Sequence, residues 1–346
     1  MNAQPAMAGE GSMTTHTQAP DHTTTPRHPP GGDIAQTHTP SAPAGPCVQV
    51  PGRVGPSARI SLVVSDMDGT LLTPQKQVTP RAQAAARALR AAGVPLCLVS
   101  SRPPGGMEMY FDQLGIDTPY GALNGGTIFN ADGTIRSSLV LDPHAVREAL
   151  RILQSRSLEA WLFKGHGWLV DNRLGDYVQA ESNAVRMTPT VVPDLAAHVH
   201  DVGKITGSST DFEAIARQEV EMGRLLAGRA SVARCSRWFL DITPPQATKG
   251  HAVRHLAALY GVGVENVACI GDMVNDVPML SIAGLSIAMG QALPDVRAKA
   301  HYTTAPNTED GWARAMEDLV LPRCVPPPRQ PPAKRHATPP THAGQG

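Results

Sequence analysis

The sequence predicts an α/β protein in which a doubly wound parallel sheet is interrupted by an inserted α+β domain. Three observations lead to this prediction. Short apolar runs alternate with helix-like stretches near residue 60 and again beyond residue 249, as is typical of parallel sheets. Acidic, hydroxyl or amide side chains directly follow several of these runs. Residues 131–238 separate the two halves, show a mixed pattern of strand and helix signals, and are numerous enough to form a domain.

The first half begins with a strand, a helix and a second strand. Residues 60–64 are an apolar run that ends at polar residues, which indicates a buried parallel strand. Residues 80–92, rich in Ala, Arg and Leu, predict a helix with Thr79 as its N-cap and Gly93 as its stop. Residues 95–99 predict the second strand, so this half contains a βαβ unit.

The alternation resumes near the other end of the chain. The predicted elements are a helix over 249–259, a strand over 267–270, a short helix over 279–283 and a strand over 285–289. We therefore expect a core domain made of two separated pieces, 58–130 and 239–321.

The inserted domain, 131–238, mixes strand and helix signals. Asp132 and Gly133 are a hairpin-turn signal. The other expected elements are helices over 143–154 and 211–226, and strands around 161–163, 168–170 and 202–205.

Both ends of the chain are rich in proline and have no hydrophobic period. Residues 1–57 and 322–346 bury too little apolar surface to offset the entropy of ordering, so we expect disordered tails. Pro-rich tails are also typical ligands of SH3-like domains, but inert disorder explains this composition equally well. No obligate protein partner is inferred.

Charge, hydropathy and cysteine usage exclude several classes of protein. The formal net charge is +0, so nothing points to nucleic acid, and no polybasic stretch points to a membrane surface. No apolar window is long enough to span a membrane, and the N-terminus has no apolar signal-peptide region. The 5 cysteines are scattered without metal-ligand spacing. We expect a cytoplasmic protein without a zinc site or disulfide framework.

Two carboxylates, Asp66 and Asp68, directly follow the first predicted strand. Ligands of open parallel sheets bind beyond the carboxyl ends of the strands. Asp66 can attack a phosphorus atom and form an aspartyl-phosphate. Asp68 can protonate the leaving oxygen and then activate water. The alternative is an Asx-type turn with solvated carboxylates.

Ser100 and Lys249 are weaker signals when each is taken alone. Ser100 ends the second strand, where its hydroxyl can bind a phosphoryl oxygen, although serine there is more often a turn former or cap. Lys249 lies in the first turn of a helix capped by Thr248. The helix dipole disfavours a cation there, so either an anion holds Lys249 or it is an ordinary surface lysine.

A third polar group, Asp272, Asn275 and Asp276, follows the strand at 267–270. Such carboxylate and amide oxygens can face one cation, and Mg²⁺ prefers oxygen ligands. The alternative is a polar turn with a capping aspartate. The four signals all occur at strand ends or beside them, and this joint order favours a single active site.

These motifs resemble a haloacid dehalogenase (HAD) superfamily phosphatase, and more finely the Cof-like branch with a type IIB cap. Residues 66–72 match the first motif, Ser100 the second, Lys249 the third and residues 271–276 the fourth. Supporting phrases lie at 123–126, 242–250, 288–290 and 309–311. The resemblance covers about 62–319 and implies a Rossmann-like HAD core with an inserted cap domain.

The resemblance also implies a role for each residue. Asp66 is the expected nucleophile and Asp68 the general acid and base. Mg²⁺ is expected on the Asp66 carboxylate, the Asp68 backbone carbonyl and Asp272. Lys249 is expected to neutralise Asp66 and the phosphoryl group. Ser100 and Asn124 are expected to bind substrate, Asn275 to bind substrate or orient Lys249, and Asp276 to support the metal site from behind.

One position departs from the family pattern. The family often has Thr-Gly-Arg at the second motif, whereas this chain has Ser100-Ser101-Arg102. Ser100 keeps the hydroxyl, but Ser101 adds bulk beside the site. This puts in doubt any substrate copied from a relative.

The cap implied by the resemblance closes over the site and favours small soluble phosphate esters over proteins or DNA. Candidate cap contacts are Trp161, Lys164, His166 and Trp168. The two tryptophans are better explained as cap core. His198 and His200 are typical of a solvated strand or loop rather than a metal site.

The expected function is therefore Mg²⁺-dependent hydrolysis of a sugar phosphate or phosphorylated cofactor through an aspartyl-phosphate. Two alternatives stay open: a phosphomutase with the same nucleophile, and a non-catalytic binding protein on the same scaffold.

Overall fold

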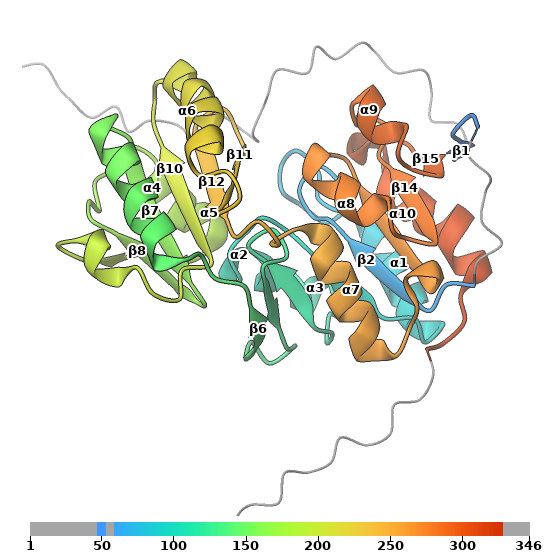
Figure 1. The fold of residues 1–346 in the computed structure, drawn as a ribbon. Helices are drawn as coiled ribbons and strands as arrows, with labels where there is room; N and C mark the ends of the chain where they lie inside the picture. The colour runs from blue at the N-terminus through green and yellow to red at the C-terminus, as the bar shows by residue number, and fades with distance from the viewer. Residues whose placement is uncertain (1–46, 53–58, 328–346) are drawn as a thin grey trace, which may run out of the picture.

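The computed structural model describes residues 47–52 and 59–327. These residues form two lobes (Figure 1). One lobe holds β2, β14, α1 and α7, the other holds β7, β10, α4 and α6, and the α2 and β6 region lies between them. Among the described residues, no helix is long and apolar enough to cross a membrane.

The core sheet has six strands in the order β1-β15-β14-β13-β2-β3. Their bounds are β1 Val48–Gln49, β2 Leu62–Ser65, β3 Leu96–Leu98, β13 Val267–Gly271, β14 Leu285–Ala288 and β15 Tyr302–Thr303. All neighbours are parallel except β1 and β15. The chain proceeds from β2 to β3 on one side and returns to β13 on the other, so the winding direction switches beside β2.

Helices cover both faces of this sheet. They are α1 Pro80–Ala91, α2 Gly105–Glu108, α3 Phe111–Leu114, α7 Lys249–Tyr260, α8 Val277–Leu280, α9 Pro294–Arg297 and α10 Gly311–Ala315. Short helical turns are η2 Val264–Asn266, η3 Val274–Asp276, η4 Asn307–Glu309, η5 Met316–Val320 and η6 Leu321–Arg323. Along β2, Val63 packs in the cluster of α1 and α10, whereas Leu62 and Val64 pack in that of α7 and α8. This doubly wound architecture confirms the predicted fold class.

A small antiparallel sheet joins the lobes. It consists of β4 Tyr120–Ala122, β5 Thr127–Phe129 and β6 Ile135–Ser138. A parallel bridge between Val99 and Gly121 continues the core sheet toward β4. Asp132 and Gly133 lie in the β5–β6 turn, as predicted.

The inserted lobe is a six-stranded sheet in the order β11-β12-β10-β7-β8-β9. Its strands are β7 Glu159–Lys164, β8 Gly167–Val170, β9 Thr190–Val191, β10 Lys204–Ser208, β11 Ser231–Arg234 and β12 Phe239–Thr243. Its helices are α4 Pro143–Ser155, α5 Val178–Val185, α6 Phe212–Leu225 and the turn η1 Leu195–His198. Alternate side chains of β7 face opposite sides of this sheet. Leu162 packs with α4 and α6, whereas Trp161 and Phe163 belong to the hydrophobic cluster shared with the core lobe.

The structure corrects the predicted extent of the tails. Residues 47–52 are not disordered as expected, because β1 adds an antiparallel strand to β15, whose edge would otherwise be unpaired. At the other end, η6 and a bridge between Ile60 and Cys324 keep the chain on the core beyond residue 322. The remaining parts of both predicted tails lie outside the described residues.

Strand pairing also bears on the domain limits. β6 pairs with β5 rather than with the inserted sheet, although it lies after residue 131. β12 pairs with β10 and β11, although it lies after residue 238. We therefore propose that the inserted domain spans 141–243.

Candidate active site

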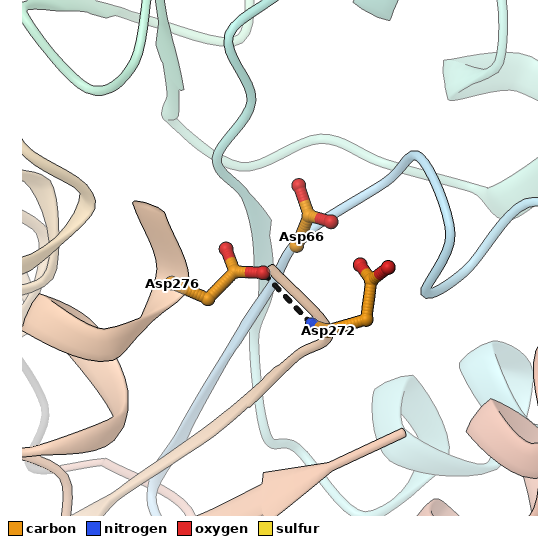
Figure 2. A group of neighbouring side chains, drawn as sticks. All are labelled: Asp66, Asp272 and Asp276. Carbon is orange, nitrogen blue, oxygen red and sulfur yellow. Dashed lines mark hydrogen bonds between the residues drawn. The ribbon is translucent and has the colours of Figure 1, made fainter. Parts of the chain in front are cut away.

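Three buried carboxylates meet beside the switch point of the core sheet. Asp66 directly follows β2, and Asp272 directly follows the neighbouring strand β13. With Asp276 of η3, they offer oxygen atoms that all lie within 4.8 Å of one another. Figure 2 shows Asp66 on the segment that follows β2, Asp272 on the segment that follows β13, and Asp276 on the helical turn beyond it. The predicted convergence at the strand ends is therefore present for these three residues.

Lys249 lies between two of these carboxylates. Its Nζ is 2.5 Å from Asp66 Oδ1 and 2.6 Å from Asp276 Oδ1. Thr248 caps α7 by accepting a hydrogen bond from the His251 amide at 3.1 Å, as predicted. Burial lowers the pKa of Lys249, but the attraction of Asp276 and Asp66 is stronger and the pKa is raised overall. The two anions explain why a cation is tolerated in the first turn of a helix.

Asp276 is fully engaged with protein groups. One oxygen binds Lys249, and the other accepts the backbone N–H groups of Asp272 and Met273 at 2.8 Å each (Figure 2). A Cβ on Gly271 would lie 2.5 Å from the Asp276 carboxyl carbon, so only glycine permits this packing. Asp276 therefore orients Lys249 and the Asp272 backbone.

Asp272 is oriented by Thr70, whose hydroxyl donates to Asp272 Oδ1 at 2.9 Å. Burial raises the pKa of Asp272 well above its usual range, and repulsion from Asp66 and Asp276 adds to this. Burial likewise raises the pKa of Asp66 to about 7, against the attraction of Lys249. Three carboxylates thus share one lysine, and the site has excess negative charge. This oxygen-rich donor set fits Mg²⁺, which Asp66 and Asp272 would hold.

Asp68 points to different partners. Its carboxylate receives two hydrogen bonds from Arg102, at 2.6 and 2.8 Å, and one from Lys76 at 2.7 Å. Burial raises the pKa of Asp68, but Arg102 and Lys76 outweigh it and hold the pKa well below its usual range. Sequence reasoning did not identify these two cations. The arginine of the second motif was the available signal for one of them.

The predicted substrate-binding residues Ser100, Asn124 and Asn275 make hydrogen bonds with neighbouring loops. Ser100 is buried and follows Val99, which pairs with Gly121 of β4. The Ser100 hydroxyl accepts a hydrogen bond from the Arg102 backbone N–H at 3.2 Å. Asn124 donates to the Ala247 carbonyl at 3.1 Å, just before Lys249. Asn275 donates to Asn124 at 3.4 Å, which connects the fourth motif to this loop.

The cap residues singled out in the sequence have mixed positions. Trp161 and Trp168 are 2% and 1% exposed and lie edge to face with centroids 5.3 Å apart, as expected for cap core, and Trp161 also lines a cavity. His166 is exposed and pairs with the Gly133 carbonyl across the β5–β6 turn. His198 ends η1 and His200 is exposed, as expected for a solvated loop.

This chain is similar to known proteins in sequence and in fold. Residues 63–316 match the haloacid dehalogenase-like hydrolase family. The Bacillus subtilis (strain 168) protein YxeH is 32% identical over 273 residues, which cover 75% of this chain and 98% of YxeH. HMP-PP phosphatase of Cronobacter sakazakii is 28% identical over 235 residues, which cover 68% of this chain and 85% of the relative. The crystal structure of a haloacid dehalogenase-like hydrolase from Bacteroides thetaiotaomicron is 28% identical, with a TM-score of 0.69 over 75% of this chain and 99% of that chain.

The chain belongs to the haloacid dehalogenase-like hydrolase family. The family match confirms the resemblance drawn from the four motifs and the prediction of an enzyme of the hydrolase class.

Proposed function

We propose that this protein is a HAD-type phosphatase that hydrolyses small phosphate monoesters through an aspartyl-phosphate on Asp66. The observation that supports it most is the position of Asp66, beside the switch point of the sheet and in contact with buried Lys249. The sugar phosphates and phosphorylated cofactors expected from the sequence are the proposed substrate class. The name of the Cronobacter sakazakii relative, a phosphatase of HMP-PP, supports a small phosphorylated substrate.

In the first step, an Asp66 carboxylate oxygen attacks phosphorus, and the bond between phosphorus and the leaving oxygen breaks. The leaving oxygen takes a proton from Asp68, which must first leave Arg102 and Lys76 to carry one. In the second step, water attacks phosphorus, Asp68 accepts its proton, and the bond to Asp66 breaks. Lys249 offsets negative charge on the nucleophile and the phosphoryl group throughout.

The Asp66 and Asp272 carboxylates and the Asp68 backbone carbonyl are the groups proposed to hold Mg²⁺. The ion, when bound, neutralises phosphoryl charge and lowers the barrier to attack by an anionic nucleophile. The phosphoryl group or the leaving group is proposed to contact Ser100, Asn124 and Asn275. Their hydrogen bonds connect the loops that also carry the proposed catalytic groups.

A phosphate-release screen over small monoesters tests the proposal, with and without Mg²⁺ and beside Asp66→Asn. We expect release by the natural sequence in Mg²⁺ and none by Asp66→Asn. Phosphate retained on an isomeric product would instead indicate a mutase. Absence of release together with unchanged ester binding in both proteins would indicate a binding protein. A fluoroberyllate adduct on Asp66, absent in Asp66→Asn, gives a readout independent of turnover.

A further inference from the structure

A cavity of about 80 Å³ lies between the inserted domain and the loop that follows β3. The core side of the cavity is formed by Ser101, Arg102 and Pro103, and the other side by α5 and strands β7, β10 and β12. Because Arg102 also binds Asp68, the cavity lies next to the proposed acid. It is therefore placed to receive the leaving group of a bound ester.

The charges of Lys204 and Asp241 in this cavity are already satisfied. Lys204 Nζ donates to Asp241 and to the Ser101 carbonyl at 3.1 Å each, and lies 4.9 Å from the centroid of the Phe163 ring. Asp241 accepts a second hydrogen bond from the Thr206 hydroxyl at 2.8 Å. Both charged side chains are at most 10% exposed. This pair therefore has little capacity left for a ligand.

Arg102 is equally committed. Two of its nitrogens donate to Asp68, and a third donates to the Gly106 carbonyl at 2.9 Å. Its guanidinium carbon also lies 5.5 Å from the centroid of the Tyr110 ring. The two cations that line the cavity are thus neutralised by carboxylates of the protein.

Glu181 of α5 differs from its charged neighbours. Within residues 47–52 and 59–327, its carboxylate makes no hydrogen bond or ion pair, although it lines the cavity and is half-buried. Burial raises the pKa of Glu181, and the attraction of Lys204 and Arg102 does not fully offset this effect. A half-buried carboxylate without donors from the protein gains free energy when a ligand supplies a charged donor in place of water.

The remaining surroundings favour a cationic donor over a neutral or anionic one. Lys204 is paired with Asp241, and both Arg102 and Lys76 are paired with Asp68, so Glu181 is the carboxylate of this group that a cationic ligand would neutralise. Aromatic side chains, Trp161, Phe163 and Phe239, also line the cavity. Aromatic faces combined with a carboxylate attract ammonium groups, whereas a second anion on the ligand would meet Glu181.

We propose that Glu181 is a specificity-determining residue that accepts a hydrogen bond from an ammonium group on the leaving alcohol, so that phosphate esters of amino alcohols are preferred. This inference rests on the proposed phosphatase function. The cavity also indicates the size of the leaving group, since its volume is about half that of a protein cavity of about 150 Å³ that binds benzene. A short chain such as ethanolamine suits it.

The test compares three esters of nearly equal size: O-phosphoethanolamine, 2-hydroxyethyl phosphate and phosphoglycolate. Calorimetric dissociation constants are measured in the Asp66→Asn background, so that turnover does not intervene. We expect the amine to bind roughly tenfold or more tightly than the alcohol, as one charge-assisted hydrogen bond implies. Glu181→Gln should bring this ratio close to one and strengthen binding of phosphoglycolate. Glu181→Asp keeps the charge and should retain part of the preference.

Glu213→Gln is the matched control, because Glu213 is an exposed residue of α6 and should leave the ratio unchanged. Equal binding of amine and alcohol, failure to bind either ester, or a ratio that Glu181→Gln does not alter would each overturn the inference. Thermal melting checks that every variant is folded. Phosphate release by the natural sequence is measured separately, so failure of the phosphatase proposal is recognised independently of the binding ratio.

Discussion

At the scale of single residues, the candidate site depends on one buried lysine between two buried carboxylates. Lys249 is 2% exposed, and its partners Asp66 and Asp276 are 5% and 0% exposed at their side chains. Removing one partner of such a group leaves unpaired buried charge, which costs more than the intact pair contributes. Lys249 is therefore expected to matter for stability as well as for turnover.

Lys249→Met tests this expectation. Near neutral pH we expect the free energy of unfolding to fall by about 3–5 kcal/mol, as when a buried ion pair is broken. Phosphate release should fall by about 10²–10³, the usual effect of losing one group that stabilises transition-state charge. Urea unfolding and initial rates measure the two effects. Lys76→Met is the stability control, because Lys76 is 41% exposed and its removal should cost less than about 1 kcal/mol. Equal costs for the two variants would contradict the assignment.

Gly69 is a second residue on which the site depends. Its φ is +78°, and a Cβ would lie 2.3 Å from Asp272 Oδ2, so both backbone conformation and space require glycine. We expect Gly69→Ala to displace Asp272 and to weaken both turnover and Mg²⁺ binding at least tenfold. Roughly this loss is expected when one metal ligand is misplaced. Initial rates over a Mg²⁺ titration measure both.

Gly223→Ala is the control for that substitution. Gly223 lies in α6 with nothing within 4 Å of an added Cβ, so alanine there should leave turnover unchanged. It should raise the free energy of unfolding by about 0.4–1 kcal/mol, because alanine restricts the unfolded chain. Normal Mg²⁺ dependence in Gly69→Ala would contradict the proposed ligand role of Asp272.

Sequence patterns predicted the residues at strand ends but not all of their partners. Asp66, Asp272 and Lys249 could be placed because strand periodicity and a helix cap locate them without knowledge of side-chain conformations. Thr70, which binds Asp272, and Arg102, which binds Asp68, could not be paired in the same way. Those contacts depend on how separate loops fold against one another.

At the scale of elements, α7 connects local chain structure to the site, because it carries Lys249 in its first turn. Thr248→Ala removes the hydroxyl that caps this helix, and Thr79→Ala removes the equivalent cap of α1. Loss of each cap should cost about 1 kcal/mol of stability, and Thr79→Ala also loses the hydrogen bond from the Thr79 hydroxyl to Asp310. Only Thr248→Ala should also reduce kcat, since only α7 positions Lys249. Urea unfolding and steady-state rates separate the effects, and equal losses of kcat would show that α7 does not position the lysine.

The elements also show which structural features are local. The helices at 80–91 and 249–260 lie within one or two residues of their predicted bounds, because caps and stops are set by adjacent residues. The assignment of β12 to the inserted sheet depends instead on pairing with β10, more than 30 residues earlier. The β1–β15 pair is more distant still. Apolar periodicity identifies strands, but it does not identify the sheet edge that each strand joins.

At the scale of the whole molecule, the fold brings the end of β2, the end of β13 and the inserted domain to one place. The first two supply acidic groups whose charge exceeds that of the nearby lysine. This excess couples folding, proton binding and metal binding. Burial raises the pKa of Asp66 to about 7 and raises that of Asp272 in the same direction.

The sign of the resulting pH dependence follows from proton uptake. Between the unfolded pKa of an aspartate, about 4, and the raised folded value, the folded metal-free protein binds more protons than the unfolded chain. The contribution of Asp66 and Asp272 to stability is therefore present at low pH and is lost as pH rises toward 7. Asp68, whose pKa is lowered, stays ionised across this range and does not reverse the trend.

Mg²⁺ should act most strongly where those carboxylates are ionised, because metal binding competes with protons for the same oxygens. We expect the rise in melting temperature on adding Mg²⁺ to be several degrees near pH 8 and much smaller near pH 5.5, measured by thermal unfolding at constant ionic strength. Asp272→Asn should remove most of the rise at both values, whereas Asp318→Asn should retain it, because Asp318 lies in η5 beside Cys47 and is not part of the carboxylate cluster. An equal rise at both pH values, or one that persists in Asp272→Asn, would show that the ion binds elsewhere.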